Sequence, residues 1–297
     1  SAASDVYKRQ GYGMFTGGLG FQYGAERLGM LTVPAAAGNT KRQIKFITDF
    51  GTTALHAIPS YASRIHEVME EMGIDPVRDT KLRTLVIGAE PHSEEQRRKI
   101  EKMLGVKAYN SFGMSEMCGP GVAFECTEQN GMHIWEDYYI VEIVDPQTLE
   151  PVPDGEVGEI VVRPRKSGVQ YGIFCAYNSD EALYARAWRG GVYHTGDTAY
   201  RDKDGYYWYV GRLDDIIKSS GYRIGPFEIE SVLMEHPAVL ECAVTGAPDP
   251  VRGQVVKATI VLTKNYAPSD ELVKELQVYV KKQTAPYKYP RIVEFVT

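Results

Sequence analysis

The chain has 297 residues, of which 43% are hydrophobic and 24% are charged, and its formal net charge is -6. This composition is typical of a globular protein and excludes a disordered or fibrous chain, while the acidic balance without a Lys and Arg cluster disfavours nucleic acid as a partner. No apolar run reaches the roughly 20 residues that cross a membrane, and four cysteines without an apolar leader predict a reducing cytoplasm rather than a disulfide framework.

The first segments in chain order are irregular. Residues 1–10 share no pattern with the rest of the chain and are left unassigned. Residues 11–20 are rich in glycine, so something approaches this backbone closely. Two interpretations stay open: the backbone contacts a ligand, or it forms a tight helix-packing surface. The absence of a Lys and a Ser/Thr at phosphate-loop spacing favours the packing surface.

The middle of the chain alternates short strands with helices. Residues 84–87 predict a buried strand, a turn follows at 88–91, and Ser93 then caps a charged amphipathic helix that runs to Met103. A second strand is expected at 107–111. Over residues 11–210 this alternation predicts a mostly parallel sheet covered by helices.

The turns after these two strands are candidate ligand loops, because α/β sheets bind ligands outside the carboxyl ends of their strands. After Ser111, residues 112–116 form a predicted loop that contains Gly113, Ser115 and Glu116. Hydroxyls, a flexible glycine and a carboxylate can bind a nucleotide phosphate and hold Mg²⁺. An ordinary solvated turn is the alternative for this hexapeptide.

From residue 211 the pattern changes to that of a small α+β domain. A helix is expected to begin at Pro226, strands at 238–245 and 255–262, and a second helix at 269–282. We therefore place a domain boundary between 211 and 215.

Two polar blocks next to this boundary carry the strongest signal. Residues 193–197 end in Asp197, and residues 211–223 include Arg212. An Asp can accept both ribose hydroxyls of a nucleotide, an Arg can reach the ribose or a phosphate, and a polar segment flanked by glycine can act as a hinge.

With these blocks the chain resembles the adenylate-forming, or AMP-binding, superfamily of acyl-CoA synthetases, luciferases and peptide-synthetase adenylation domains. Residues 88–91 resemble its adenine-binding loop, residues 111–116 its aromatic-Gly-x-Ser/Thr-Glu motif, and residues 155–160 its Gly-Glu strand. Asp197 matches the ribose-binding Asp and Arg212 the family's Arg. The resemblance implies an α/β fold, with part of a large domain of mixed and parallel sheets at 11–211 and a small, truncated α+β lid domain at 212–297.

The resemblance also assigns roles to single residues. Glu116 would hold Mg²⁺, Lys218 would change its environment as the lid moves, and Asp214 would be the hinge. Tyr12, Phe15 and Ala89 would line the acyl pocket, although ordinary core packing is an equal alternative. The residues expected to bind ATP, AMP or CoA are Gly88, Ala89, Glu90, Pro91, Ser111, Phe112, Gly113, Met114, Ser115, Asp197, Arg212, Gly221 and Tyr222.

The implied function is that of an AMP-forming acyl-CoA ligase, which activates a carboxylic acid with ATP and passes the acyl group to CoA. Its partners would be the small acid and CoA, with a homodimer left open. One alternative is an enzyme that loads a carrier protein. The other is a nucleotide- or acyl-adenylate-binding fragment without turnover.

The two parts of the chain resemble different members. Residues 11–162 are similar to phenylacetate-CoA ligase and residues 163–297 to acetyl-CoA and medium-chain acyl-CoA synthetases, with the seam expected between 162 and 172. The acid could thus be an aryl or a medium-chain one. The family's phosphate loop is expected before Tyr12 and its Lys-bearing motif after Thr297, so we expect this chain to be weak in adenylation.

Two cysteines and a histidine that lie close together in the sequence are a weak candidate for a zinc site. Cys118, Cys126 and His133 have suitable side chains, but a tetrahedral site needs four ligands and a fourth is not evident. Free thiols and an ordinary His are the favoured interpretation.

Overall fold

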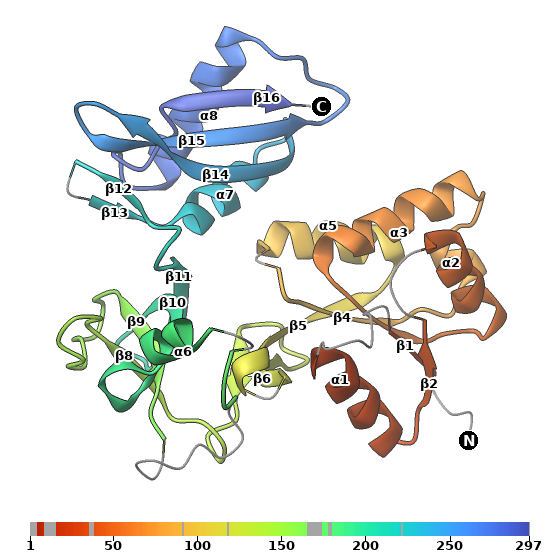
Figure 1. Ribbon diagram of the computed structural model, residues 1–297. Helices are drawn as coiled ribbons and strands as arrows, with labels where there is room; N and C mark the ends of the chain where they lie inside the picture. Colours follow the sequence, from red (N-terminus) through yellow and green to blue (C-terminus); the bar gives the residue numbers. More distant parts are fainter. Residues whose placement is uncertain are drawn as a thin grey trace. The chain divides into compact units, whose positions relative to one another are not determined.

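The computed structural model describes residues 5–8, 16–35, 39–90, 92–117, 119–164, 174–177, 180–220 and 222–296. They belong to two compact units, Ser1–Tyr139 with Val169–Cys175 (unit 1) and Ile140–Gly168 with Ala176–Thr297 (unit 2). Figure 1 shows their elements in chain order. The boundary predicted at 211–215 falls inside unit 2, between two of its sheets. Within the described ranges, no helix is long and apolar enough to cross a membrane.

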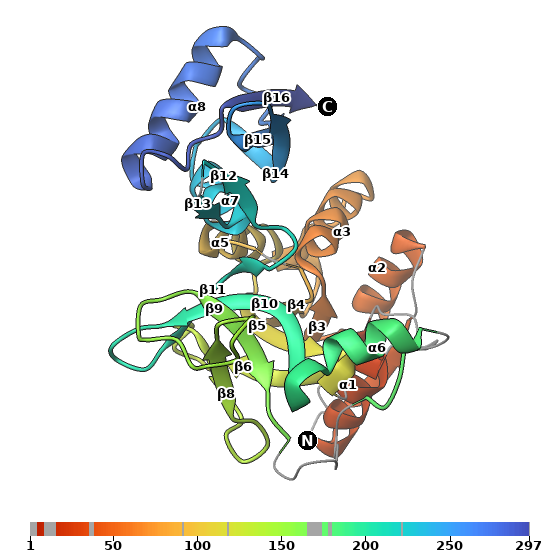
Figure 2. The ribbon, with the colours of Figure 1, turned by 60° about the vertical axis from the view of Figure 1, so that its left-hand side comes forward.

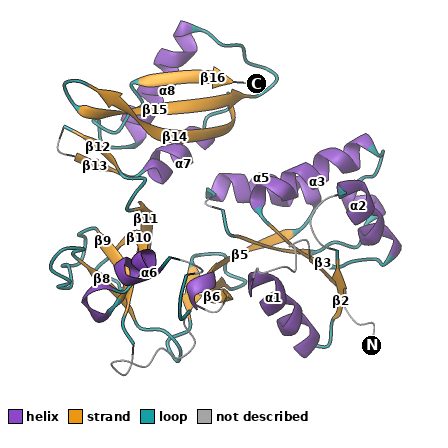
Figure 3. Ribbon diagram, viewed as in Figure 1, coloured by secondary structure: helices purple, strands orange, loops and turns teal. Residues whose placement is uncertain are grey.

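Unit 1 is built on a seven-stranded sheet of order β2-β1-β3-β4-β5-β6-β7. Its first five strands are parallel and the last two antiparallel. Helices α3 and α5 lie on one side of the sheet and α1 on the other (Figures 1 and 3). The strands are β1 (Asp5–Lys8), β2 (Leu31–Pro34), β3 (Ala54–Ala57), β4 (Thr84–Gly88), β5 (Lys107–Met114), β6 (Gly119–Glu125) and β7 (Met132–Ile134), and the helices α1 (Thr16–Arg27), α2 (Thr40–Asp49), α3 (Pro59–Glu71), α4 (Pro76–Asp79) and α5 (Glu94–Leu104).

The predicted strand at 84–87 and the helix after it are confirmed as β4 and α5. The Ser93 hydroxyl accepts a hydrogen bond from the backbone N of Gln96 at 3.2 Å, and Gly105 ends the helix in the left-handed conformation with φ 67°. The helix buries Ile100 and Leu104 completely against the main core of unit 1. Local capping and amphipathic spacing were therefore sufficient to locate this element.

The prediction of a loop at 112–116 is wrong in part. Strand β5 continues to Met114, and only then does a short 3₁₀ helix, η1 (Ser115–Met117), begin. Strand β6 pairs with this extension, and a Cβ on Gly113 would lie 2.6 Å from the backbone O of Gly119. Glycine here permits close pairing of two strands rather than a flexible turn.

Helix α1 contains part of the glycine-rich stretch. A Cβ on Gly20 would lie 2.7 Å from the side chain of Pro120 in β6, so glycine lets the helix pack closely against that strand. For this glycine, the helix-packing interpretation is the correct one. Residues 11–15 lie outside the described part of the chain.

The first part of unit 2 is a four-stranded sheet of order β11-β10-β9-β8, and all of its pairings are antiparallel. The parallel, helix-covered sheet predicted up to residue 210 is therefore wrong for this stretch. Strands β10 and β11 are joined by a tight turn at 202–206, where the side chain of Asp202 accepts two backbone N–H groups, and such short connections suit antiparallel neighbours. The elements are β8 (Val141–Val144), β9 (Gly158–Val162), α6 (Glu181–Ala187), η2 (Arg189–Gly191), β10 (Tyr193–Arg201) and β11 (Tyr207–Arg212).

The rest of unit 2, residues 212–297, is the segment predicted as the lid. The two helices and the two strands predicted here are confirmed, with Pro226 at the start of α7 and Ser269 as the cap of α8. Its strands form a sheet of order β13-β12-β15-β14, with β16 beside β15, and α8 lies against one face of it (Figure 2). Leu272, Leu276 and Val280 of α8 belong to the core cluster of this segment. The elements are β12 (Ile217–Ser219), β13 (Tyr222–Ile224), α7 (Pro226–Met234), β14 (Val239–Asp249), β15 (Gly253–Leu262), α8 (Asp270–Gln283) and β16 (Ile292–Val296).

Candidate functional site

The carboxyl ends of β4 and β5 lie side by side in unit 1. Gly88 pairs with Ser111, and a Cβ on Gly88 would lie 2.3 Å from the backbone O of Ser111. The Ser111 hydroxyl donates to the carbonyl of Ile87 at 3.2 Å. The structure thus brings together the starts of the two predicted ligand segments, 88–91 and 111–116.

The segment after β4 is fixed to α3 by one of its own side chains, the Glu90 carboxylate. Ala89 has φ 65°, a left-handed conformation that is costly for any residue except glycine. The Glu90 carboxylate accepts hydrogen bonds from the backbone N and the hydroxyl of Ser60, at 3.1 and 2.9 Å, at the first turn of α3. Glu90 therefore anchors the segment, while Ala89 beside it is exposed.

A second layer of polar side chains supports this segment, and the sequence patterns did not reveal it. The two ring nitrogens of His92 lie 3.0 Å from the carbonyl O of Glu90 and 2.5 Å from Oδ1 of Asn110. The backbone N of Asn110 donates to the carboxylate of Glu125 at 2.9 Å. Burial raises the pKa of Glu125, although the Asn110 hydrogen bond and the charge of Arg97 oppose the shift.

Glu116 supplies the carboxylate in the second segment. It lies in η1, and its backbone O accepts a hydrogen bond from the N of Phe174 at 2.8 Å. No group of three His, Cys, Asp or Glu residues that could hold a metal occurs in the described part of the chain. A single carboxylate still suits Mg²⁺, which is commonly held by one or two carboxylates together with substrate phosphates.

Asp197 and Arg212 are direct neighbours in unit 2. They are register partners on β10 and β11, and Arg212 Nη1 lies 3.7 Å from Asp197 Oδ1. The Asp197 side chain is 9% exposed and that of Arg212 is 47% exposed, so a shielded carboxylate lies beside a partly exposed guanidinium. Arg212 also donates from Nε to Asp214 at 3.1 Å.

Tyr209 belongs to the same neighbourhood, and no sequence motif pointed to it. Tyr209 is 40% exposed, and the partial burial of its phenol together with the negative charge of Asp197 raises the pKa of Tyr209 to about 12. The phenol therefore stays neutral at physiological pH and can donate a hydrogen bond.

The other predicted residues of unit 2 lie in or next to the lid. Lys218 is exposed on β12, and its backbone N donates to Oε1 of Gln254 at 2.9 Å. Tyr222 is half exposed, and its ring stacks on that of Tyr287 with centroids 4.1 Å apart. Asp214 lies in the exposed turn between β11 and β12.

The zinc candidates are described only in part. Cys126 is a half-buried free thiol and His133 is exposed on β7. The predicted residues Tyr12, Phe15, Pro91, Cys118 and Gly221 lie outside the described residues.

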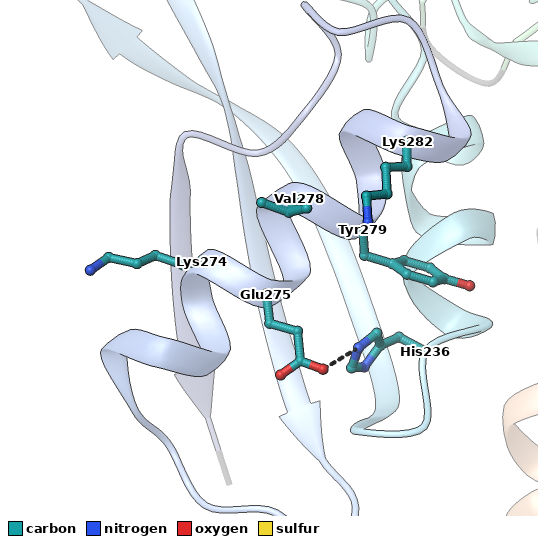
Figure 4. A pocket seen from close by; sticks show the side chains of 6 residues that line it. All are labelled: His236, Lys274, Glu275, Val278, Tyr279 and Lys282. Carbon is teal, nitrogen blue, oxygen red and sulfur yellow. Dashed lines mark ion pairs between the residues drawn. The ribbon is translucent and has the colours of Figure 1, made fainter.

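A pocket on the lid lies between α8 and the turn before β14 (Figure 4). His236 lies 3.3 Å from the carboxylate of Glu275, and its Nδ1 accepts a hydrogen bond from the backbone N of Ala238 at 3.2 Å. The two contacts fix the ring of this buried His. None of the site residues predicted from the sequence lines this pocket, whose lining residues are His236, Lys274, Glu275, Val278, Tyr279 and Lys282.

Two sets of candidate nucleotide ligands are therefore present, one at strand ends of unit 1 and one on the antiparallel sheet of unit 2. Family models match both parts of the chain: "AMP-binding enzyme" at residues 14–171 and "AMP-binding enzyme C-terminal domain" at residues 228–297. The chain belongs to this family, the adenylate-forming superfamily.

Curated relatives of the chain are CoA ligases. Human mitochondrial acyl-coenzyme A synthetase ACSM3 is 40% identical over 242 residues, which are 79% of this chain and 40% of the relative. The 4-hydroxybutyrate–CoA ligase 1 of Metallosphaera sedula is 39% identical over 261 residues, 87% of this chain and 45% of the relative. The chain thus spans less than half the length of these relatives.

Two solved structures of similar fold are CoA ligases. The anthranilate CoA ligase AuaEII, in complex with anthranoyl-AMP, matches with a TM-score of 0.80 and 26% identity over 99% of this chain and 56% of that one. A benzoate CoA ligase from Burkholderia xenovorans matches with a TM-score of 0.79 and 25% identity, over 99% and 58%. The fold of the whole chain is that of adenylate-forming CoA ligases.

Proposed function

We propose that the protein to which this chain belongs is an AMP-forming acid–thiol ligase. The substrate carboxylate attacks the α-phosphorus of ATP in line, a P–O bond forms and pyrophosphate leaves. The thiol sulfur of CoA then attacks the acyl carbonyl, the thiol loses its proton and AMP leaves. Catalysis of this kind rests on positioning the reactants and on offsetting phosphate charge.

The observation that carries the proposal is the shielded Asp197 carboxylate beside Arg212. A ribose offers two neighbouring hydroxyl donors, and an ionised carboxylate is the acceptor that makes the strongest hydrogen bonds to them. Arg212 is partly exposed and lies within 3.7 Å of that carboxylate, so it can reach the same ribose or the phosphate. In this proposal Asp197 binds the ribose hydroxyls, and Arg212 offsets the negative charge of the phosphate.

The strand ends of unit 1 would take the rest of the nucleotide. In this proposal the backbone near Ala89 contacts the adenine, while Ser111, Ser115 and the backbone of 113–115 bind the α-phosphate. Glu116 would hold Mg²⁺, whose chemistry when bound is to offset phosphate charge. The register pairing of Gly88 with Ser111, where a Cβ on Gly88 would lie 2.3 Å from the Ser111 backbone O, supports joint action of both segments.

The lid would serve the second half-reaction. Rotation about Asp214, which is exposed in its turn, would carry the turn between β12 and β13 toward the acyl-adenylate. Tyr222 and Gly221 would then face the incoming CoA thiol. Lys218, exposed on β12, would change its surroundings in the same movement.

For the acid we propose an aryl or medium-chain carboxylic acid. The named relatives and similar structures include ligases for 4-hydroxybutyrate, anthranilate and benzoate. The resemblance of residues 11–162 to phenylacetate-CoA ligase adds phenylacetate as a candidate. Tyr12, Phe15 and Ala89 are the proposed wall of the acyl pocket.

The test separates binding, adenylation and thioester formation. Calorimetric titration with AMP and ATP should show binding, and phenylacetyl-, benzoyl- and hexanoyl-adenylate should each be offered with CoA to detect acyl-CoA. Pyrophosphate release from ATP and the free acid measures adenylation separately. Binding without any acyl transfer would instead identify a nucleotide-binding fragment, and transfer only to a carrier-protein thiol would identify a carrier-loading enzyme.

A further inference from the structure

A carboxylate with no role so far is buried behind the Asp197 segment. Glu159 lies on β9, within the Gly-Glu strand motif, and it is 1% exposed. A buried carboxylate is costly unless charges or hydrogen bonds compensate it. Its partners therefore indicate what it holds in place.

Three groups of unit 2 converge on this carboxylate. His194 Nδ1 lies 2.8 Å from Oε2 of Glu159, and Arg189 Nη2 lies 3.2 Å from the same oxygen. The other oxygen, Oε1, accepts the backbone N–H of Gly196 at 3.2 Å. Nε2 of His194 lies 3.2 Å from the carbonyl O of Arg189, so the cluster closes on itself.

The Gly196 hydrogen bond matters because the ladder between β9 and β10 is interrupted there. The register shifts between His194 and Thr198, and Gly196 has φ 76°. Gly196 has no register partner on β9, so Oε1 of Glu159 takes the place of a ladder carbonyl as the acceptor of its N–H. Glu159 thereby stabilises an irregularity that a regular ladder would remove.

This irregularity determines where the backbone of Asp197 lies. The Thr195 hydroxyl donates to the carbonyl of Ile160 at 2.7 Å and accepts the backbone N–H of Asp197 at 3.0 Å. On the other side, a Cβ on Gly196 would lie 2.9 Å from Nη2 of Arg212, so a larger residue here would displace the guanidinium. The backbone at 195–197 thus sets the position of the carboxylate relative to the arginine.

We propose that Glu159, oriented by His194, is a positioning residue for ribose recognition by Asp197. Glu159 touches no nucleotide in this proposal; it holds the backbone that presents the ribose ligand. The inference rests on the proposed function, because it requires that Asp197 binds the sugar hydroxyls. It extends that function to a residue pair that the sequence left without a role.

The experiment compares AMP with 2′,3′-dideoxy-AMP, which lacks both ribose hydroxyls. Dissociation constants for both nucleotides are measured by calorimetry for the wild-type chain, Glu159→Gln and His194→Gln. Glu159→Gln keeps the shape but removes the charge, and a bond to a charged acceptor is worth about tenfold or more in affinity. We expect about a tenfold loss for AMP, little change for the dideoxy nucleotide, and a smaller loss for His194→Gln, whose amide can still donate to Glu159.

Glu142→Gln is the matched control. Glu142 lies on β8 of the same sheet and pairs with Arg163 at 2.9 Å on a more exposed surface, so this variant should keep the wild-type preference for AMP. If Glu159→Gln keeps that preference, or weakens both nucleotides equally, Glu159 is merely structural and the inference is wrong. A wild-type chain that does not distinguish the two nucleotides would overturn the ribose assignment, and this inference with it.

Discussion

At the scale of single residues, Asp197 combines shielding with a partner of opposite charge. A carboxylate that is 9% exposed loses hydration, and the guanidinium 3.7 Å away offsets part of that cost. Ribose hydroxyls would donate further hydrogen bonds to this carboxylate on binding. This balance explains why a nearly buried acid can serve as a ligand.

We predict that Asp197→Ala lowers AMP affinity about 10- to 100-fold, because two hydrogen bonds to a charged acceptor are lost. Calorimetric titration measures the change. Asp154→Ala is the control, since Asp154 pairs with Arg201 on an exposed edge of the same unit and should leave the affinity as it is. Unchanged affinity in Asp197→Ala would refute the ribose assignment.

Tyr209 supplies a prediction about pH. Its folded pKa of about 12 lies above the usual 10.0, so the neutral phenol is favoured by folding. The resulting stability is fully present below pH 10 and is lost as the pH rises through about 12. NMR titration of labelled tyrosines, assigned with Tyr209→Phe, should show this midpoint, and Asp197→Asn should lower it because a negative charge is removed. A midpoint near the usual value in the wild type would contradict the burial and charge described here.

The sequence revealed the residues that motifs mark, and it missed those that only packing brings together. Asp197 and Arg212 were expected to act together, and they are register partners. Glu159 was seen only as part of a strand motif, because its partner His194 lies 35 residues further along the chain. Burial and long-range hydrogen bonds depend on strand register, which spacing alone does not reveal.

At the scale of elements, the close approach of β4 and β5 fixes the positions of Gly88 and Ser111, where the two predicted ligand segments start. Gly88→Ala would place a methyl group 2.3 Å from the Ser111 backbone O, which forces the strands apart. We expect it to lower the free energy of unfolding by about 1 to 3 kcal/mol. Urea denaturation measures the effect.

Gly24→Ala is the matched control for that substitution. Gly24 lies in α1, and a Cβ there meets nothing within 4 Å. This change should raise stability by about 0.5 to 1 kcal/mol, because alanine loses less backbone entropy in a helix. Equal effects of the two substitutions would show that the contact between β4 and β5 is not tight.

Capping and helix-starting residues in the sequence located the helices whose ends they mark. The capping Ser93 and the helix-starting Pro226 located α5 and α7, and the helix expected from residue 269 is α8. The extension of β5 to Met114 was missed because a glycine in a polar stretch suggests a turn, whereas here it permits pairing with β6. The antiparallel sheet of unit 2 was missed because short strands look alike whichever way they pair.

At the scale of the whole molecule, the chain contains two compact units, and the candidate nucleotide ligands divide between them. Glu90, Ser111 and Glu116 belong to unit 1, while Asp197 and Arg212 belong to unit 2. The fold as a whole matches adenylate-forming CoA ligases over 99% of the chain. The proposed function therefore requires that AMP binding involves residues of both units.

Hydrogen–deuterium exchange with and without AMP is the decisive test of this requirement. We predict slower exchange of backbone amides on AMP binding in two separate regions, 88–92 with 111–116 in unit 1 and 195–198 with 211–213 in unit 2. Asp197→Ala should lower the protection of both regions, because a variant that binds at least about tenfold more weakly is at most about half occupied when AMP is held below about tenfold the wild-type dissociation constant. Protection confined to one unit, or retained in full in unit 1 when Asp197 is removed, would contradict the proposed function.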